Sequence, residues 1–237
     1  MRRFIDATLG RWLRHFAFLL ARGYYALTCN VSMSGKHLLQ DHPGALILAT
    51  HVSRHDGPLL IASLYTTARL RPIVHYREYH HWAQWIPMFL ISAIPVSSPR
   101  NWPAETRAAY KAQQLGVVRK VMARGNPVLL FPGGESRQQE HERVPPHFTG
   151  AYDVMRAARD VPVLLARIDG LGRFQKARFD HMLTFIGIKK GRRHIRIDLA
   201  QLEGLDPDLQ ITEFNARLEA LLNTPIPDSI AAPGAAH

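Results

Sequence analysis

Residues 45–58, with the sequence ALILATHVSRHDGP, contain a strand, a loop and the start of a helix. The apolar run Ala45–Ala49 is short and continuous, which is typical of a strand buried on both faces of a parallel sheet. After a loop with two histidines, Asp56-Gly57-Pro58 opens an apolar helical pattern. Asp56 is the expected N-cap, and proline is tolerated in the first helical turn. His51 is therefore predicted at the carboxyl end of a strand, where open α/β sheets bind ligands.

The spacing of His51 and Asp56 across a tight loop allows their side chains to meet. A carboxylate that accepts from one imidazole nitrogen fixes the tautomer and raises the basicity of the other nitrogen. Such a pair can take a proton from a hydroxyl group or from water. The chain has no Gly-x-Ser-x-Gly motif, so a serine hydrolase of that type is not supported. In the alternative interpretation, Asp56 only caps the helix and His51 is an ordinary loop histidine.

The composition describes a globular, basic chain. Of its 237 residues 46% are hydrophobic, and Cys29 is the only cysteine, so the chain has no internal disulfide. Lys and Arg number 30 against 19 Asp and Glu, a formal net charge of +11 that favours an anionic partner. The basic residues are spread along the sequence and no nucleic-acid motif occurs. We therefore expect a membrane lipid surface as partner and no nucleic acid.

Strand and helix patterns alternate along the chain. Residues 127–137, PVLLFPGGESR, repeat the order of a buried strand followed by a loop, here with Gly133 and Gly134. Alternation of this kind predicts an α/β fold, a single domain with a mostly parallel central sheet flanked by helices. Further strands are expected at 72–76, 161–168 and 194–199, the last paired with 182–188, and helices at 105–124, 151–158 and 206–222. The boundaries are an N-terminal helical segment (1–30), the main domain (31–223) and a disordered tail (224–237).

The N-terminal segment has helical periodicity and a basic character. Its longest uninterrupted apolar stretch, Phe16–Ala21, is far shorter than the roughly 20 residues that cross a bilayer. A signal peptide is disfavoured because no small-x-small cleavage site follows. We expect an amphipathic interfacial helix whose Trp, Phe and Leu side chains enter the acyl boundary while arginines meet head groups. The alternative is a helix that simply packs on the domain.

Histidines are numerous enough to raise a metal site as a possibility. They include His51, His55, His75, His80 and His81. A zinc pair at this spacing needs one helical face, whereas His51 and His55 fall in a predicted loop, and no cysteine pairs accompany them. We therefore expect no metal and no cofactor.

Four blocks, taken together, carry a family resemblance. The first is His51 and Asp56, separated by four residues. The second is Arg77, Pro87-Met88-Phe89, Pro95-Val96 and Arg100; the third is Phe131–Arg137; the last is His147–Gly150 with Val161-Pro162-Val163. Over roughly residues 30–200 the chain resembles the phospholipid and glycerol acyltransferase superfamily, which includes lysophosphatidic acid acyltransferases. The third block departs from the usual Phe-Pro-Glu-Gly-Thr-Arg, because Gly133 replaces the glutamate and Ser136 the arginine.

The resemblance implies a glycerol-3-phosphate acyltransferase-like fold and an O-acyltransferase of lipid biosynthesis. Acyl-CoA or acyl carrier protein would donate the acyl group to a lysophospholipid hydroxyl, at the cytoplasmic face of a membrane. In the family the second and third blocks bind the acceptor, so the substrate-binding candidates are Arg77, Arg100, Gly133, Gly134, Glu135 and Arg137. Because the third block is altered, another lipid hydroxyl or amine is also open as acceptor.

The expected mechanism is direct transfer. His51 is the general base and Asp56 orients it, and the acceptor oxygen attacks the thioester without a protein nucleophile. Backbone amides near Gly57 or Gly133-Gly134 are the expected oxyanion donors. Apolar residues of 82–94 either shape the acyl site or pack in the core. A non-catalytic membrane-binding module and a metal-dependent hydrolase are the alternatives from other classes.

Overall fold

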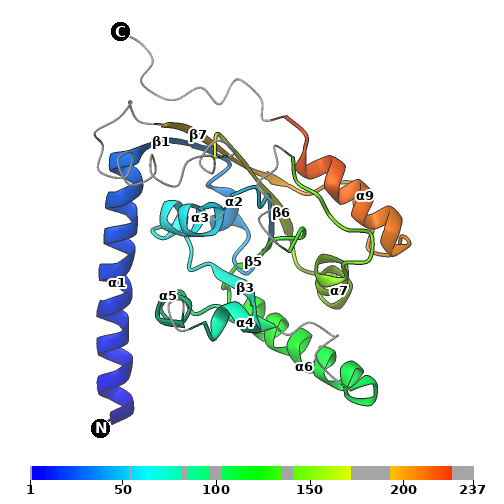
Figure 1. Ribbon diagram of the computed structural model, residues 1–237, viewed down its shortest axis with the longest axis horizontal. Coiled ribbons are helices and arrows are strands. Elements are labelled where there is room, and N and C mark those ends of the chain that lie inside the picture. The colour runs from blue at the N-terminus through cyan, green and yellow to red at the C-terminus, as the bar shows by residue number, and fades with distance from the viewer. Residues whose placement is uncertain are drawn as a thin grey trace.

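The computed structural model describes residues 2–53, 55–81, 85–96, 103–134, 141–171 and 193–225. Within these residues, seven strands form one sheet in the order β1-β7-β6-β2-β5-β3-β4 (Figure 1). The strands are β1 (Cys29–Ser34), β2 (Leu46–Ala49), β3 (Arg71–His75), β4 (Ile94–Val96), β5 (Val128–Leu130), β6 (Val163–Asp169) and β7 (Arg193–Gln201). The strand predicted from the apolar run at 45–49 is thus a central strand.

The sheet is mostly parallel, as predicted. Strands β6, β2, β5, β3 and β4 run in one direction. Strand β7 is antiparallel to β6, and β1 is parallel to β7, so this edge runs the opposite way. The strand predicted at 194–199 is β7, while its expected hairpin partner at 182–188 lies outside the described residues. The parallel strands bring the segments that follow β2, β3, β4 and β5 to one edge of the sheet.

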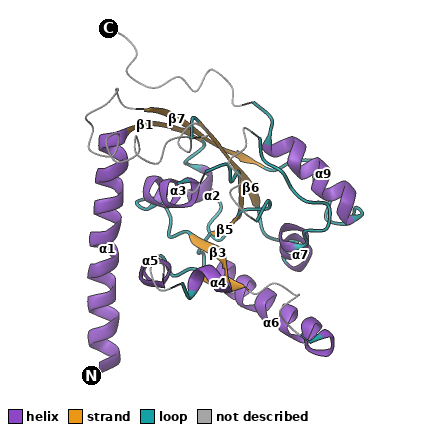
Figure 2. Ribbon diagram, viewed as in Figure 1, coloured by secondary structure: helices purple, strands orange, loops and turns teal. Residues whose placement is uncertain are grey.

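Helices cover both faces of the sheet (Figure 2). They are α1 (Arg2–Thr28), α2 (Leu38–Asp41), α3 (Asp56–Leu64), α4 (Tyr76–Tyr79), α5 (Trp85–Leu90), α6 (Ala104–Ala123), α7 (Gly150–Ala157) and α9 (Ile211–Leu222). The helices predicted at 105–124 and 151–158 are α6 and α7. The helix predicted from 206 begins only at Ile211, because Asp206 instead accepts a hydrogen bond from the backbone N–H of Asp208 in a turn.

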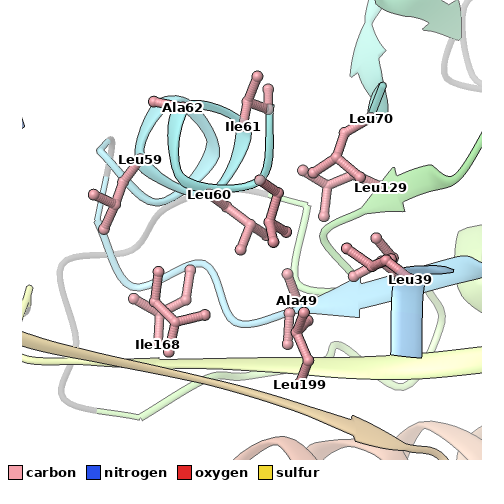
Figure 3. Packing of buried hydrophobic residues seen from close by; sticks show 14 of the residues in the cluster. Leu39, Ala49, Leu59, Leu60, Ile61, Ala62, Leu70, Leu129, Ile168 and Leu199 are labelled. Carbon is pink, nitrogen blue, oxygen red and sulfur yellow. The ribbon is translucent and has the colours of Figure 1, made fainter. Parts of the chain in front are cut away.

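Strand β2 divides the core into two clusters because successive side chains point to opposite faces. Ile47 and Ala49 pack with α3, and Leu46 and Leu48 pack with α6, α7 and α9. Figure 3 shows the first cluster, with Leu59 and Leu60 of α3 above Ala49. All four residues of β2 are buried, which confirms the prediction of a strand that is covered on both faces of the sheet.

The N-terminal helix α1 carries large apolar side chains on both its packed and its exposed face. Phe18 and Tyr25 are buried in the first core cluster, and α1 packs against α3 and α5. The opposite face leaves large apolar side chains exposed, with Trp12 at 69% and Phe16 at 63%. No helix among the described residues is long and apolar enough to cross a bilayer.

The apolar residues of α6 are only partly buried. Val118 and Met122 are buried, but Ala109 and Ala112 are exposed. The second half of α6 packs on the sheet, while the first half continues past it (Figure 1). The side chains on one side of this first half line a cavity instead of the core.

Candidate active site

His51 and Asp56 meet at the end of β2. The His51 Nδ1 lies 3.4 Å from the Asp56 Oδ2, and Asp56 is completely buried. The imidazole keeps an exposed fraction of 19%, so one side of the ring is reachable from solvent. With Nδ1 directed at the carboxylate, Nε2 is the nitrogen left to accept a proton. The two residues therefore have the geometry of a base and its orienting acid.

Asp56 is not the N-cap of α3, contrary to the prediction. The cap position is His55, and Asp56 is the first residue of the helix. Its Oδ2 turns back to accept the backbone N–H of Ser53 at 2.7 Å, which closes the loop and aims the carboxylate at His51. Burial raises the pKa of Asp56, and the contacts with His51 and Ser53 oppose this rise. Pro58 lies in the first turn, as expected.

Phe131 forms the other wall of the histidine site. Its ring stacks on the His51 imidazole with centroids 4.3 Å apart and an angle of 28° between the planes. Phe131 follows β5, the neighbour of β2 in the sheet, so the two rings meet because their strands are paired. The ring also lies close to Gly57, where a Cβ would be 3.5 Å from it. The imidazole is therefore held between a carboxylate at its edge and an aromatic ring at its face.

The two glycines after β5 have different surroundings. Gly133 is buried, and a Cβ there would lie 2.2 Å from the Glu142 Oε1. Gly134 has φ +74°, and a Cβ there would lie 2.7 Å from the Phe148 ring, so glycine is required on both counts. The Gly133 N–H bonds to Glu142 and the Gly134 N–H to the Phe131 carbonyl at 3.1 Å. Neither amide is therefore free for an oxyanion.

Glu142 is a buried acid beside the site that no motif indicated. One carboxylate oxygen accepts the backbone N–H of His51, and only 3% of the residue is exposed. Burial raises the pKa of Glu142 to about 7, against the lowering effect of the hydrogen bonds from His51 and Gly133. Nothing in the surrounding sequence, QQEHERVPPHF, distinguishes this glutamate from a surface residue.

The raised pKa predicts a pH dependence of stability. In the unfolded chain Glu142 loses its proton near pH 4.5, whereas in the folded chain it keeps the proton until about pH 7. Between these values the folded state binds more protons, so its stability falls as the pH rises. Between pH 5 and pH 8 the free energy of unfolding should fall by about 2–3 kcal/mol more in the parent than in Glu142→Gln. Urea unfolding at both pH values measures the difference, and equal pH dependence in the two proteins would contradict it.

A cavity of about 860 Å³ adjoins the histidine site. It lies at the ends of β3, β4 and β5 and is closed by α6 and α7. Phe131, the stacking partner of His51, is part of its lining. Its lining includes both buried apolar and exposed polar side chains; the former include Val118, Leu130 and Val154, and the latter Arg77, Glu78, Arg107 and His147. The cavity thus offers apolar surface together with charged side chains of both signs.

The sequence-predicted binding residues are partly assembled here. Arg77 in α4 and Gly134 line the cavity, while Gly133 is buried behind it against Glu142. Arg100, Glu135 and Arg137 lie outside the described residues. The described part of 82–94 does not line the cavity; Ile86 and Phe89 of α5 are exposed instead. Of the residues that the structure describes, no three His, Cys, Asp or Glu side chains group as metal ligands.

The comparisons with known proteins agree with this architecture. A family model described as Acyltransferase matches residues 30–168. Among solved structures, the 1-acyl-sn-glycerophosphate (LPA) acyltransferase PlsC from Thermotoga maritima is similar in fold. The TM-score is 0.51 and the sequence identity 15%, over 90% of this chain and 83% of that one. No curated protein matches the chain significantly.

The family match includes the loop of His51 and Asp56, Phe131 with its two glycines, and Glu142. It extends from β1 through β6 and so spans most of the sheet. It covers more than half of the sequence, which confirms the expected family: the chain belongs to the Acyltransferase family.

Proposed function

We propose that the protein is an O-acyltransferase that moves a fatty acyl group from acyl-CoA or acyl carrier protein to the hydroxyl of a lysophospholipid or related lipid. The observation that carries the proposal is the His51–Asp56 pair, 3.4 Å apart at the end of a central strand, in a member of the acyltransferase family. A base held by a buried carboxylate is what deprotonation of an alcohol requires.

In this mechanism His51 Nε2 takes the proton of the acceptor hydroxyl as its oxygen attacks the thioester carbonyl. The tetrahedral intermediate collapses with loss of the thiolate, to which the imidazolium returns the proton. Asp56 keeps the proton on Nδ1 and stabilises the imidazolium that forms. No covalent enzyme intermediate is needed, which agrees with the absence of a Gly-x-Ser-x-Gly motif.

The oxyanion site is best placed at the first turn of α3. The amides of Gly133 and Gly134 already have acceptors within the chain. The first N–H groups of a helix have no partner within the helix and attract negative charge. Gly57 lies in this turn, next to Asp56 and in contact with Phe131, so its N–H is our candidate donor.

The cavity beside His51 supports an amphipathic acceptor. Its apolar lining suits an acyl chain, and Arg77 and Arg107 at the exposed part suit a phosphate group. Lys111 also lines the cavity, where it pairs with Asp153 at 2.6 Å. We therefore favour a lysophospholipid over a neutral acceptor.

A lipid surface is the natural location for such a substrate. On α1 the exposed face carries Trp12, Phe16, Leu19 and Leu20, and Ile86 and Phe89 of the adjacent α5 are exposed as well. Apolar side chains on a helix with a basic flank, here the exposed Arg22, are typical of interfacial binding. We propose that the protein is peripheral, with α1 and α5 at the cytoplasmic surface of the membrane.

The proposed location predicts a loss of vesicle binding when charge is placed on α1. The double variant Trp12→Glu/Phe16→Glu should bind anionic phospholipid vesicles at least about tenfold more weakly, because two large apolar groups no longer enter the acyl boundary. Vesicle sedimentation measures the change. The matched control is Val117→Glu, an exposed apolar residue on α6, which should bind like the parent. Equal binding by the double variant would contradict a membrane role of this face.

The reaction is tested by acyl transfer in mixed micelles with acyl-CoA or acyl carrier protein as donor. The acceptor panel should include lysophosphatidate, lysophospholipids with larger head groups, and a neutral monoacylglycerol. Ester product with an anionic acceptor supports the proposal. Product only with the neutral acceptor would overturn the assignment of Arg77 and Arg107, and no product with any pair from a folded, vesicle-bound protein would overturn the activity.

A further inference from the structure

Glu142 connects the loop of His51 with the loop of the two glycines. Its Oε2 accepts the backbone N–H of His51, and its Oε1 fills the space where a side chain at position 133 would be. The Gly133 N–H also bonds to this carboxylate. Residues 50 and 51 follow the last residue of β2, so the His51 N–H has no partner in the sheet and takes the carboxylate as its acceptor. The carboxylate bonds to the backbone of His51 and not to its imidazole.

Helix α9 and its C-cap residue Asn223 hold the segment that carries Glu142. The Glu142 N–H donates to the Asn223 Oδ1, and the Asn223 Nδ2 donates to the Glu142 carbonyl, both at 2.9 Å. The Val144 N–H donates to the Glu219 carboxylate at 2.8 Å. In one further side chain, Asn215, the Nδ2 lies 2.9–3.1 Å from the carbonyl oxygens of Pro145, Pro146 and Phe148, which share its two N–H groups.

These hydrogen bonds hold a segment, residues 141–148, that has no regular secondary structure of its own. Residues 141–148 form no helix or strand, so their backbone groups must find other partners. The side chains of α9 provide them, and α9 lies beyond the residues that the family model matches. A displacement of about 1 Å at a catalytic group can cost on the order of 10²-fold in rate. The contacts that fix the position of Glu142 therefore also affect the position of His51.

We propose that α9 positions the general base, through hydrogen bonds from Asn223 to the backbone of Glu142 and from His51 to its carboxylate. The proposal rests on the proposed function, because it assigns a role in the same reaction. Glu142 is a positioning residue: it is buried, it contacts the backbone of His51, and it takes no part in the transfer of the proton. The C-terminal helix thereby becomes part of the catalytic apparatus.

Steady-state kinetics at pH 8 test the role in catalysis. The variants are Glu142→Gln, whose amide accepts only one of the two N–H groups, and Asn223→Ala, which removes both contacts to Glu142. Each should lower kcat per folded molecule about tenfold or more, with the acceptor KM changed less than about twofold. Asn223→Asp retains the acceptor for the Glu142 N–H and should recover part of the loss. The control on the same helix is Glu213→Gln, whose partner Arg217 is exposed, and it should leave kcat unchanged.

The double variant distinguishes a connected pair from two separate defects. If Asn223 acts through Glu142, Asn223→Ala adds less than about twofold to the loss caused by Glu142→Gln. Multiplied losses would overturn the connection. Lower thermal stability with an unchanged kcat per folded molecule would overturn the positioning role and leave only a structural one.

Hydrogen exchange tests the arrangement without any substrate. Amide exchange of peptides that contain His51 should be at least about tenfold faster in Asn223→Ala than in the parent, while peptides of α6 exchange equally. Unchanged exchange at His51 would overturn the proposal. Faster exchange in a protein that transfers no acyl group would instead retain the connection and reject the proposed reaction, so the two failures are distinguishable.

Discussion

Replacing His51 by alanine is expected to lower kcat/KM for acyl transfer at least about 10³-fold. The imidazole is the only side chain near the end of β2 that combines a buried carboxylate at Nδ1 with a reachable second nitrogen, among the residues that the structure describes. Without it the acceptor hydroxyl must lose its proton to water, and an alcohol is a poor nucleophile when protonated. Because we propose that the acceptor binds in the cavity, its binding is expected to stay within a fewfold of the parent.

The fold should survive this change. His51 is partly exposed, and its backbone bond to Glu142 does not depend on the side chain. Circular dichroism and thermal unfolding check the fold, and initial rates with the preferred donor and acceptor check the activity. The control is His80→Ala, an exposed histidine that follows α4 and whose ring contacts the Tyr76 carbonyl, and it should retain full activity. A folded His51→Ala protein with parental activity would rule out the general-base mechanism.

Much of the fold follows from local patterns. The run at 45–49 was predictable as a doubly buried strand because all of its residues are apolar, and the same holds for 128–130. The helices predicted at 105–124 and 151–158 are α6 and α7, within a residue or two at each end. Such segments are set by periodicity within a few residues, which the sequence alone displays.

The reversed edge of the sheet depends on non-local pairing. β7 has the same apolar alternation whether it pairs parallel or antiparallel, and its partners are fixed by residues far away in the chain. The start of α3 shows a second reason why a prediction from sequence fails. Asp56 was a good cap by residue type, but its carboxylate serves Ser53 and His51, so the helix begins at Asp56 itself.

The candidate site likewise combines residues that the local sequence predicts with residues that only the tertiary structure brings there. His51 and Asp56 were recognisable because their spacing in one loop brings them together whatever the rest of the chain does. The contacts of Phe131 and Glu142 with His51 were not predictable, since they form only when β5 pairs with β2 and when α9 holds the 141–148 segment. The glutamate missing from position 133 illustrates the point: a carboxylate occupies the adjacent space, but it comes from residue 142.

The change Asp56→Asn is expected to lower kcat about 10³-fold while the protein stays folded. An asparagine oxygen can keep the hydrogen bond from the Ser53 N–H, which is 2.7 Å from the Asp56 Oδ2. The loop should therefore retain its shape, and the loss of the negative charge is the main change. Without that charge the imidazolium formed during proton transfer is no longer stabilised, so kcat falls while the acceptor KM changes little.

The thermal stability of Asp56→Asn, unlike its activity, should stay the same or increase. Burial raises the pKa of Asp56, which means that the folded state disfavours the ionised form relative to the unfolded chain. The ionised form of Asp56, which the proposed mechanism requires, is therefore held at a cost in stability, and the amide removes that cost. Thermal unfolding of Asp56→Asn should begin at the same temperature as in the parent or at a higher one. A group that lowers stability and raises activity is one retained for chemistry.

The combination of the two measurements distinguishes a catalytic carboxylate from a structural one. If Asp56 only closed the loop, Asp56→Asn would lower thermal stability, and the activity per folded molecule would be unchanged. If it serves His51, activity falls steeply and stability does not. The control is Asp208→Asn, an exposed carboxylate paired with Arg159, which should alter neither. Parental kcat in folded Asp56→Asn would show that the charge is dispensable, and His51 would then act without an electrostatic partner.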